Sequence, residues 1–160
     1  MGSIQPFGLL KTIGLSPPPS LVFKTPKLTC PFKYSNSGKW CALKVIQSWA
    51  TKGSKRIDEL SILQRATSAN PMHPGYPRVV TLWDHFTHIG PNGDHLCLVM
   101  EPLGENLVSL KARLPGYRLS LNLVKKIARQ TLLGLDYLHS NCGIIHTGIN
   151  PTQGCNIFHV

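Results

Sequence analysis

The amino-acid sequence predicts an α+β fold, in which a mostly antiparallel sheet with one helix is followed by a helical part. Two strand-like segments, 78–87 and 95–101, flank a Gly-, Pro- and Asn-rich stretch at 90–94 that is typical of a hairpin turn. Apolar residues recur at helical spacing over 120–139. A chain of 160 residues is long enough for one ordinary domain with its own core.

The N-terminal third of the chain is dominated by turn signals. Residues 7–13 and 21–24 are predicted as short strands around a proline-rich turn at 16–20, where three consecutive prolines force extended geometry and remove three backbone donors. Residues 25–39 are predicted as a loop. The next segment, 39–46, is rich in β-branched and aromatic residues and is predicted as a strand.

Apolar residues recur at helical spacing over 54–67, which is predicted as a helix with Ser54 as a suitable N-cap. The proline-rich stretch 69–77 excludes a helix. The expected buried face of the helix comprises Ile57, Leu60, Ile62 and Leu63.

The C-terminal part of the sequence predicts two further helices. A short helix is expected over 104–113, and Pro115 with Gly116 ends it. The helix at 120–139 begins at Ser120, which can cap it. Its apolar positions are Leu121, Val124, Ile127, Ala128, Leu132, Leu135 and Leu138.

The net charge of +10, from 17 Lys+Arg against 7 Asp+Glu, is compatible with nucleic acid, phosphates or an acidic protein as a partner. The basic residues are scattered between Lys11 and Arg129 rather than clustered, and no RNA-binding motif is present. Nucleic-acid binding is therefore not our first interpretation of the charge. A basic, non-catalytic binding module for RNA or an acidic protein remains the alternative.

The cysteines and histidines predict neither a disulfide framework nor a metal site. The five cysteines are odd in number and have no CxxC spacing, which favours reduced thiols in a cytoplasmic or nuclear protein. The histidines at 85, 88 and 95 lack the spacing of a helical metal motif. No apolar run approaches the roughly 18–20 residues that cross a bilayer, so no membrane association is expected.

Five segments occur in an order and spacing that resemble a known family. They are Cys41–Lys44 (CALK), Glu59 on the following helix, Leu98–Gly104, Gly134–His139 (GLDYLH) and Ile144–Thr147 (IIHT). Together they are similar to the first half of a eukaryotic serine/threonine protein kinase domain.

Three details resemble the SR-protein kinase branch: His146-Thr147 in place of His-Arg, the hairpin at 90–95, and the hinge at 101–104. The resemblance covers roughly residues 8–150. It implies a kinase-like small lobe and hinge over 1–103, followed by the start of a helical large lobe over 104–160 that is truncated after the catalytic loop.

The resemblance assigns Lys44 to the α- and β-phosphates of ATP, and Glu59 to holding that lysine. Ala42 lies on the same strand face as Lys44, where it can contact the adenine ring. The gatekeeper would be Met100, with Glu101 and Leu103 as hinge residues. Each position has a simpler alternative: Lys44 as an ordinary surface lysine, Ala42 as core, and the hinge as a buried strand end.

The glycine-rich loop departs from the family pattern. Only Gly14 of the expected glycines is retained, and the prolines at 17–19 remove donors that phosphates would use. Ile13 and Leu21 can still cover the base. We expect ATP binding to be weak or absent.

The catalytic loop departs further, because the related kinases read H-T-D-x-K-P-x-N where this chain reads HTGINPTQ over 146–153. Gly148 replaces the aspartate that accepts the substrate proton, and Asn150 replaces the phosphate-steadying lysine. Gln153 occupies the metal-binding asparagine position, unless an insertion makes Asn156 the match. No catalytic residue is intact, and we expect no magnesium site.

The function that follows is a truncated or degenerate serine/threonine kinase-like protein with residual ATP binding and no phosphotransfer. The same pattern fits a pseudokinase fragment or an incomplete gene product. Recognition of Arg/Ser-rich substrates belongs to a lobe that the chain lacks, and it is assigned to no residue. The helix at 120–139 would lose its usual neighbours, so we expect a protein partner to cover its exposed face.

Overall fold

The computed structural model describes residues 15–16, 28–34, 40–46, 59–90 and 93–152. They belong to two compact units, which are described separately below. The first unit contains the described residues up to Leu60 together with Leu82–Pro102. The second contains Ser61–Thr81 and the described residues from Leu103 onward, so neither unit is one uninterrupted stretch of chain.

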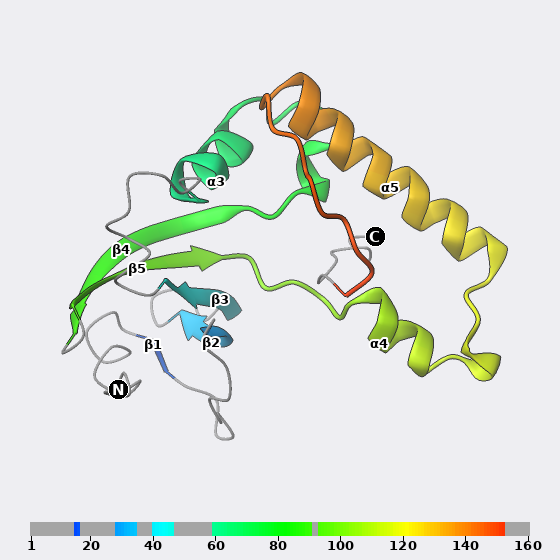
Figure 1. Ribbon diagram of the computed structural model, residues 1–160, viewed down its shortest axis with the longest axis horizontal. Helices are drawn as coiled ribbons and strands as arrows, with labels where there is room; N and C mark the ends of the chain where they lie inside the picture. The colour runs from blue at the N-terminus through cyan, green and yellow to red at the C-terminus, as the bar shows by residue number, and fades with distance from the viewer. Residues whose placement is uncertain (1–14, 17–27, 35–39, 47–58, 91–92, 153–160) are drawn as a thin grey trace. The chain divides into compact units, whose positions relative to one another are not determined.

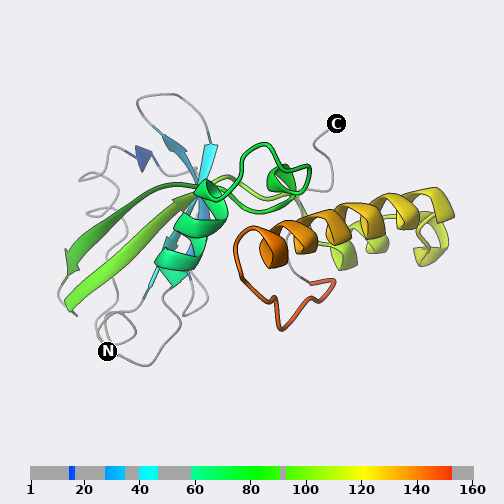
Figure 2. The ribbon, with the colours of Figure 1, turned by 90° about the horizontal axis from the view of Figure 1, so that it is seen from above.

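A five-stranded antiparallel sheet, in the order β1-β2-β3-β5-β4, forms the first unit (Figure 1). The view from above shows β4 and β5 inclined to β2 and β3, as the twist of such sheets requires (Figure 2). The strands are β1 (Leu15–Ser16), β2 (Leu28–Tyr34), β3 (Trp40–Val45), β4 (Leu82–Gly90) and β5 (Gly93–Met100).

The core of this unit lies on the two central strands. On β3, Cys41, Leu43 and Val45 are buried, while the residues between them are half-buried. On β5, every residue from Cys97 to Met100 is buried, so the side chains on both faces of this part of the strand are covered. The strand predicted over 39–46 is confirmed as β3, and its side chains alternate between buried and half-buried from Cys41 to Val45.

The predicted hairpin is also confirmed, since β4 and β5 pair up to Gly90 opposite Gly93. Gly93 has a φ of 103°, a conformation that favours glycine. The first strand begins at Leu82 and not at residue 78, because Tyr76–Arg78 form one 3₁₀ turn, η1, that contains Pro77.

The prediction of a loop over 25–39 was wrong for Leu28–Tyr34, which form β2. The strand contains Pro31, which lies directly opposite Ala42 of β3. On its other side β1 pairs only with Lys33 and Tyr34, so within the described strands Pro31 has no neighbour there. A missing N–H is tolerated at such an edge position. The strands predicted at 7–13 and 21–24 lie outside the described residues.

The first predicted helix is confirmed over its described part, α3 (Glu59–Ser68). Its buried residues are Leu63 and Ala66, whereas Leu60 and Ile62 are only half-buried. The predicted cap Ser54 and the predicted core residue Ile57 lie outside the described residues.

Both later helices are confirmed, with N-caps that explain where they begin. In α4 (Leu107–Ala112), the Asn106 side chain accepts a hydrogen bond from Ser109 N. In α5 (Leu121–Ser140), the Ser120 hydroxyl accepts one from Leu123 N, as predicted. No helix in the described parts of the chain is long and apolar enough to cross a membrane.

The C-terminal half of α5 is anchored by Tyr137, whose side chain is fully buried. Its hydroxyl donates to Ala66 O at 2.7 Å and accepts from Asn70 N at 3.4 Å. The Tyr76 ring meets it edge-on, with centroids 5.8 Å apart. Burial raises the pKa of the Tyr137 hydroxyl above its ordinary value.

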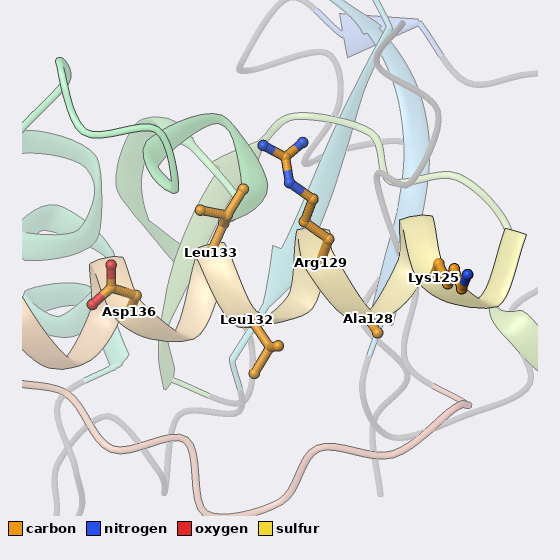
Figure 3. A pocket seen from close by; sticks show the side chains of 6 residues that line it. All are labelled: Lys125, Ala128, Arg129, Leu132, Leu133 and Asp136. Carbon is orange, nitrogen blue, oxygen red and sulfur yellow. The ribbon is translucent and has the colours of Figure 1, made fainter. Parts of the chain in front are cut away.

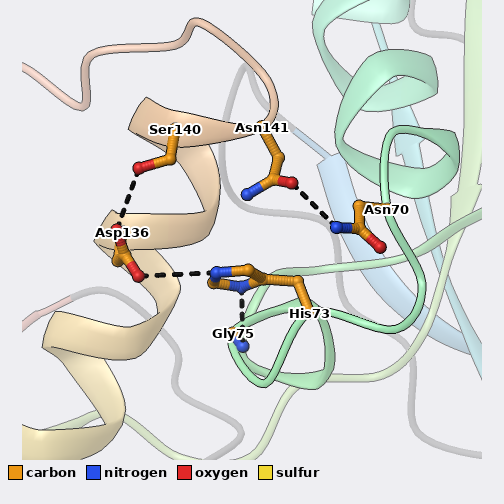
Figure 4. A network of polar contacts seen from close by, with 6 residues as sticks. All are labelled: Asn70, His73, Gly75, Asp136, Ser140 and Asn141. Atoms are coloured by element: carbon orange, nitrogen blue, oxygen red, sulfur yellow. Dashed lines mark hydrogen bonds and ion pairs between the residues drawn. The ribbon is translucent and has the colours of Figure 1, made fainter.

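A polar network joins the segment 70–75 to the same end of α5 (Figure 4). Asn70 Nδ2 donates to Asn141 Oδ1 at 2.9 Å, and His73 Nε2 lies 3.4 Å from Asp136 Oδ2. Because His73 Nδ1 accepts from Gly75 N at 3.0 Å, the ring proton sits on Nε2 and points to Asp136.

Gly75 lies against the backbone of α5. A Cβ atom added there would be 1.9 Å from Leu133 O, which no side chain can tolerate. Gly134, one residue farther along α5, is less crowded, since its added Cβ would be 3.4 Å from Arg78 Cβ. The close approach of the segment to the helix therefore depends on glycine at 75.

We expect Gly75→Ala to destabilise the protein by about 3 kcal/mol, because the segment and α5 must move apart. Gly134→Ala is the control: it should be neutral or stabilise by up to about 1 kcal/mol, since alanine favours the helix. Urea unfolding followed by circular dichroism measures both. Equal effects of the two substitutions would contradict the close approach.

Burial raises the pKa of the Cys97 thiol to about 11, with a backbone hydrogen bond from His88 opposing the shift. The thiolate therefore favours the unfolded chain, whose thiol has an ordinary pKa of 9.0. The contribution of the neutral, buried thiol to the unfolding free energy is fully present below about pH 9 and is lost as the pH rises through about 11.

Between about pH 8 and about pH 11 we expect Cys97 to account for a loss of about 2–3 kcal/mol in unfolding free energy. Urea unfolding of wild type and Cys97→Ala across this range measures it. The variant should have a lower unfolding free energy at about pH 8 because of its cavity, but that free energy should fall less as the pH rises. Parallel pH profiles would show that the buried thiol does not contribute.

Candidate functional site

An ion pair joins strand and helix in the first unit. Lys44 lies on β3, and its Nζ donates to Oε1 of Glu59, the first residue of α3. The Lys44 side chain is 24% exposed and that of Glu59 is 42% exposed, so the pair is accessible to solvent and to ligands. The structure thus brings together the two residues that the sequence predicted as partners.

The face of β3 that carries Lys44 is flanked by apolar side chains. Ala42 shares this face, because side chains alternate along a strand. Directly opposite on β5, Met100 pairs with Ala42 and Leu98 pairs with Lys44. Cross-strand partners point to the same side of a sheet, so a positive charge lies beside an apolar surface.

Leu98 was not among the predicted site residues. The signal that identifies it is its position two residues before Met100, which places both side chains on one face of β5. The prediction followed the family motif at the strand end and did not extend the alternation backwards.

The other predicted nucleotide contacts are divided among different parts of the chain. Glu101 follows Met100 directly and is half-buried in the first unit. Leu103 belongs to the second unit, where its side chain is exposed. Ile13, Gly14 and Leu21 lie outside the described residues.

The segment 146–152 of the second unit is held by local hydrogen bonds. His146 Nδ1 accepts from Gly148 N at 3.3 Å. Asn150 Oδ1 accepts from Thr152 N at 2.9 Å and also from the Thr152 hydroxyl. Leu107 N, at the start of α4, donates to Pro151 O at 3.1 Å. The Asn150 side chain is therefore used to close its own turn.

The backbone conformation at residue 148 does not require glycine. It is not among the glycines with a positive φ, and a Cβ atom added to it would meet nothing within 4 Å. Both the backbone conformation and the open surroundings of residue 148 would therefore accept a side chain.

Acidic groups are scarce around this segment. Asp136 is the one Asp or Glu in the described chain beyond Arg129, and it lies on α5, where it accepts from the Ser140 hydroxyl and faces His73. Gln153 and Asn156 lie outside the described residues. Among the described residues, no group of three or more His, Cys, Asp or Glu side chains is arranged to hold a metal ion.

Comparison with known proteins identifies the family to which the chain belongs. The protein kinase domain family matches residues 30–158, which is more than half of the chain. This chain belongs to the protein kinase family. Within this family it is similar to SR-protein kinases over about 70% of its length.

Several kinases share 40–46% identity with this protein kinase family member. Protein kinase dsk1 of Schizosaccharomyces pombe is 46% identical over 110 residues, or 69% of this chain and 20% of its own length. Serine/threonine-protein kinase SRPK of Physarum polycephalum is 42% identical over 117 residues, or 72% and 27%. SRSF protein kinase 3 of Mus musculus is 40% identical over 115 residues, or 71% and 20%. The chain thus spans about a quarter or less of each of these relatives.

We expect Gly148→Asp to fold like the wild type, with a change in unfolding free energy of less than about 0.5 kcal/mol, because the added side chain enters open space. Gly75→Asp is the contrasting variant, since its Cβ would meet Leu133 O. Thermal unfolding of the three proteins tests this. A large loss of stability in Gly148→Asp would show that the loop requires glycine.

Proposed function

We propose that this protein is a serine/threonine kinase-family chain of the SR-protein kinase type that binds ATP weakly through its small lobe and does not transfer phosphate. The observation that carries the proposal is the Lys44–Glu59 ion pair. It is the lysine–glutamate contact on which nucleotide binding by protein kinases depends. The segment 146–152, in contrast, lacks the groups that the chemistry needs.

The residues beside the ion pair suit ATP. Lys44 offers a cation for the α- and β-phosphates, and Glu59 restricts where that cation lies. Ala42 and Met100 offer a small and an apolar surface for the adenine ring on the same face of the sheet. A backbone group of Glu101 would bind the edge of the base, whereas the other predicted hinge residue, Leu103, belongs to the second unit. ATP, when bound, would supply the phosphoryl group that an intact kinase transfers.

Two missing side chains argue against phosphotransfer. Gly148 has no carboxylate to accept the proton of a substrate hydroxyl, and a general base contributes about 10²–10⁴ in rate. Asn150 carries no charge, and its carbonyl is engaged with Thr152, whereas positioned charge contributes about another 10²–10³. We infer that magnesium is not required for whatever nucleotide binding remains.

A reducing compartment, cytoplasmic or nuclear, is part of the proposal. In the described chain, Cys97 and Cys142 are buried free thiols, as is common for proteins whose thiols stay reduced.

The decisive test is a thermal-shift titration with ATP. At about 100 times its Kd, a ligand adds about 2.7 kcal/mol to the unfolding free energy. We expect a clear shift for wild type that is lost in Lys44→Ala. Lys111→Ala is the matched control, because Lys111 is exposed on α4 and should leave the shift unchanged.

Two further conditions separate binding from chemistry. Omitting Mg²⁺ should leave the ATP shift nearly unchanged, and incubation with an Arg/Ser-rich peptide should give no detectable phosphopeptide. No ATP shift in the folded protein would overturn the nucleotide part of the proposal. Phosphorylation of the peptide that Lys44→Ala abolishes would overturn the claim that transfer is lost.

A further inference from the structure

His95 of β5 is a buried histidine whose two ring nitrogens have different surroundings. The residue is 3% exposed, and its Nδ1 lies 3.1 Å from Ile46 O. A carbonyl oxygen can only accept, so the ring proton sits on Nδ1 and Nε2 carries a lone pair. Nε2 is itself buried and has no hydrogen-bond partner in the described part of the chain. A buried acceptor without a partner is rare in folded proteins, and a bound ion is one explanation for it.

The pairing of β4 with β5 brings a second imidazole to the same face of the sheet. His88 of β4 lies directly opposite His95 in the register, and it is half-buried. Residues directly opposite each other in an antiparallel pair point to the same side, with Cβ atoms about 4.5–5.5 Å apart. The sequence prediction of no metal site rested on the lack of helical spacing, which does not apply to two residues that a hairpin brings face to face.

The hydrogen bond from His95 Nδ1 to Ile46 O has the form that metal-binding histidines require. A ligating imidazole almost always donates its other ring N–H to a carbonyl or carboxylate, which fixes the tautomer and the direction of the ring. The acceptor is itself held in place, because Ile46 N donates to Leu96 O at 2.8 Å. The ring of His95 is thus oriented by the ends of β3 and β5, with Nε2 left as the ligand atom.

We propose that His88 and His95 form a binding site for a divalent transition-metal ion, of which Zn²⁺ is the representative, with His95 Nε2 as the buried ligand and His88 as the ligand nearer to solvent. Imidazole nitrogen suits Zn²⁺, Cu²⁺ and Ni²⁺, whereas Mg²⁺ prefers oxygen ligands. The bound ion would join β4 to β5 across the hairpin. This site does not depend on whether the first unit binds ATP.

The proposed site has two protein ligands. Cys97 is two residues from His95 on the same face of β5, but its thiol donates to His95 O at 3.7 Å and is therefore protonated. This agrees with the lack of any cluster of three or more ligating side chains among the described residues. Water would fill the other positions around the ion, so the ion should exchange more readily than in a structural zinc site with four protein ligands.

The depression on α5 offers no comparable arrangement. It has a volume of about 540 Å³ and is lined by side chains of this one helix, among them Lys125, Arg129 and Asp136 (Figure 3). Its acid, Asp136, already accepts from the Ser140 hydroxyl and faces His73. We assign no ligand to it.

The test is isothermal titration calorimetry of the full chain with Zn²⁺ alone, under reducing conditions. His88→Asn removes one ligand and should raise the Kd for Zn²⁺ at least about tenfold, since even the loss of a hydrogen bond behind a ligand costs about 10–100-fold. His85→Asn is the matched control: His85 is exposed on β4 opposite Leu98, on the other face of the strand, and its loss should leave the Kd unchanged. Mg²⁺ at the same concentrations should give no binding heat that His88→Asn removes.

A second variant separates ligation by His95 from its role in the fold. In His95→Asn the side-chain amide can still donate to Ile46 O, but no atom replaces Nε2. This variant should keep the melting temperature of the metal-free wild type to within a few degrees and lose the rise in melting temperature that Zn²⁺ causes. In ¹⁵N spectra of the imidazoles, His95 should carry its proton on Nδ1, and Zn²⁺ should shift the signals of His88 and His95 but not that of His85.

Three results would overturn the proposal. The first is the absence of any Zn²⁺ binding by the folded wild type. The second is a Kd that His88→Asn and His95→Asn leave unchanged, because other histidines or thiols would then hold the ion. The third is an ¹⁵N spectrum in which His95 Nε2 keeps its chemical shift when Zn²⁺ is added, since a buried water would then be the partner of that nitrogen.

Discussion

The alternation of side chains along β3 is the constraint on which the first unit depends. Cys41, Leu43 and Val45 enter the core, and this fixes the residues between them on the other face. A shift of register by one residue would bury the Lys44 ammonium and expose three core side chains. The same alternation on β5 brings Met100 opposite Ala42. The position of the lysine thus follows from the packing of its neighbours.

The Lys44–Glu59 ion pair restricts where the Lys44 ammonium lies more than it stabilises the fold. Both side chains are partly exposed, and pairs of this kind contribute about 0–1 kcal/mol. Burial of the β3 and β5 side chains contributes far more, at about 25 cal/mol per Å². A contact that is weak for folding but restricts a cation is suited to a ligand that carries negative charge. This is why the pair carries more weight in the functional argument than its energy would suggest.

Periodicity made much of the fold predictable. The β-branched and aromatic composition of 39–46 and the long apolar pattern of α5 specify elements from local sequence alone, and both were placed correctly. The loop predicted over 25–39 rested on the turn residues at 35–38, and β2 was missed because its pairing with β3 cannot be read from the local sequence. For the candidate site, the order of the motifs identified Lys44 and Glu59. Identifying Leu98 as their neighbour required knowledge of the register between β3 and β5. Which side of α5 is anchored could not be predicted, because it depends on Gly75 and Tyr76, some sixty residues earlier in the chain.

The segment 146–152, which corresponds to the catalytic loop by its motif, has internal hydrogen bonds that do not involve an acidic side chain. His146, Asn150 and Thr152 close local turns, and Pro151 O is bound by Leu107 N at the start of α4. None of these contacts needs a carboxylate at 148, and the space beside Gly148 is open. On the proposed function, the acid absent from position 148 is a group that acts on substrate, and the loop's own hydrogen bonds do not depend on it. The proposed nucleotide binding by the small lobe rests on other residues, so it does not depend on the proposed loss of phosphotransfer.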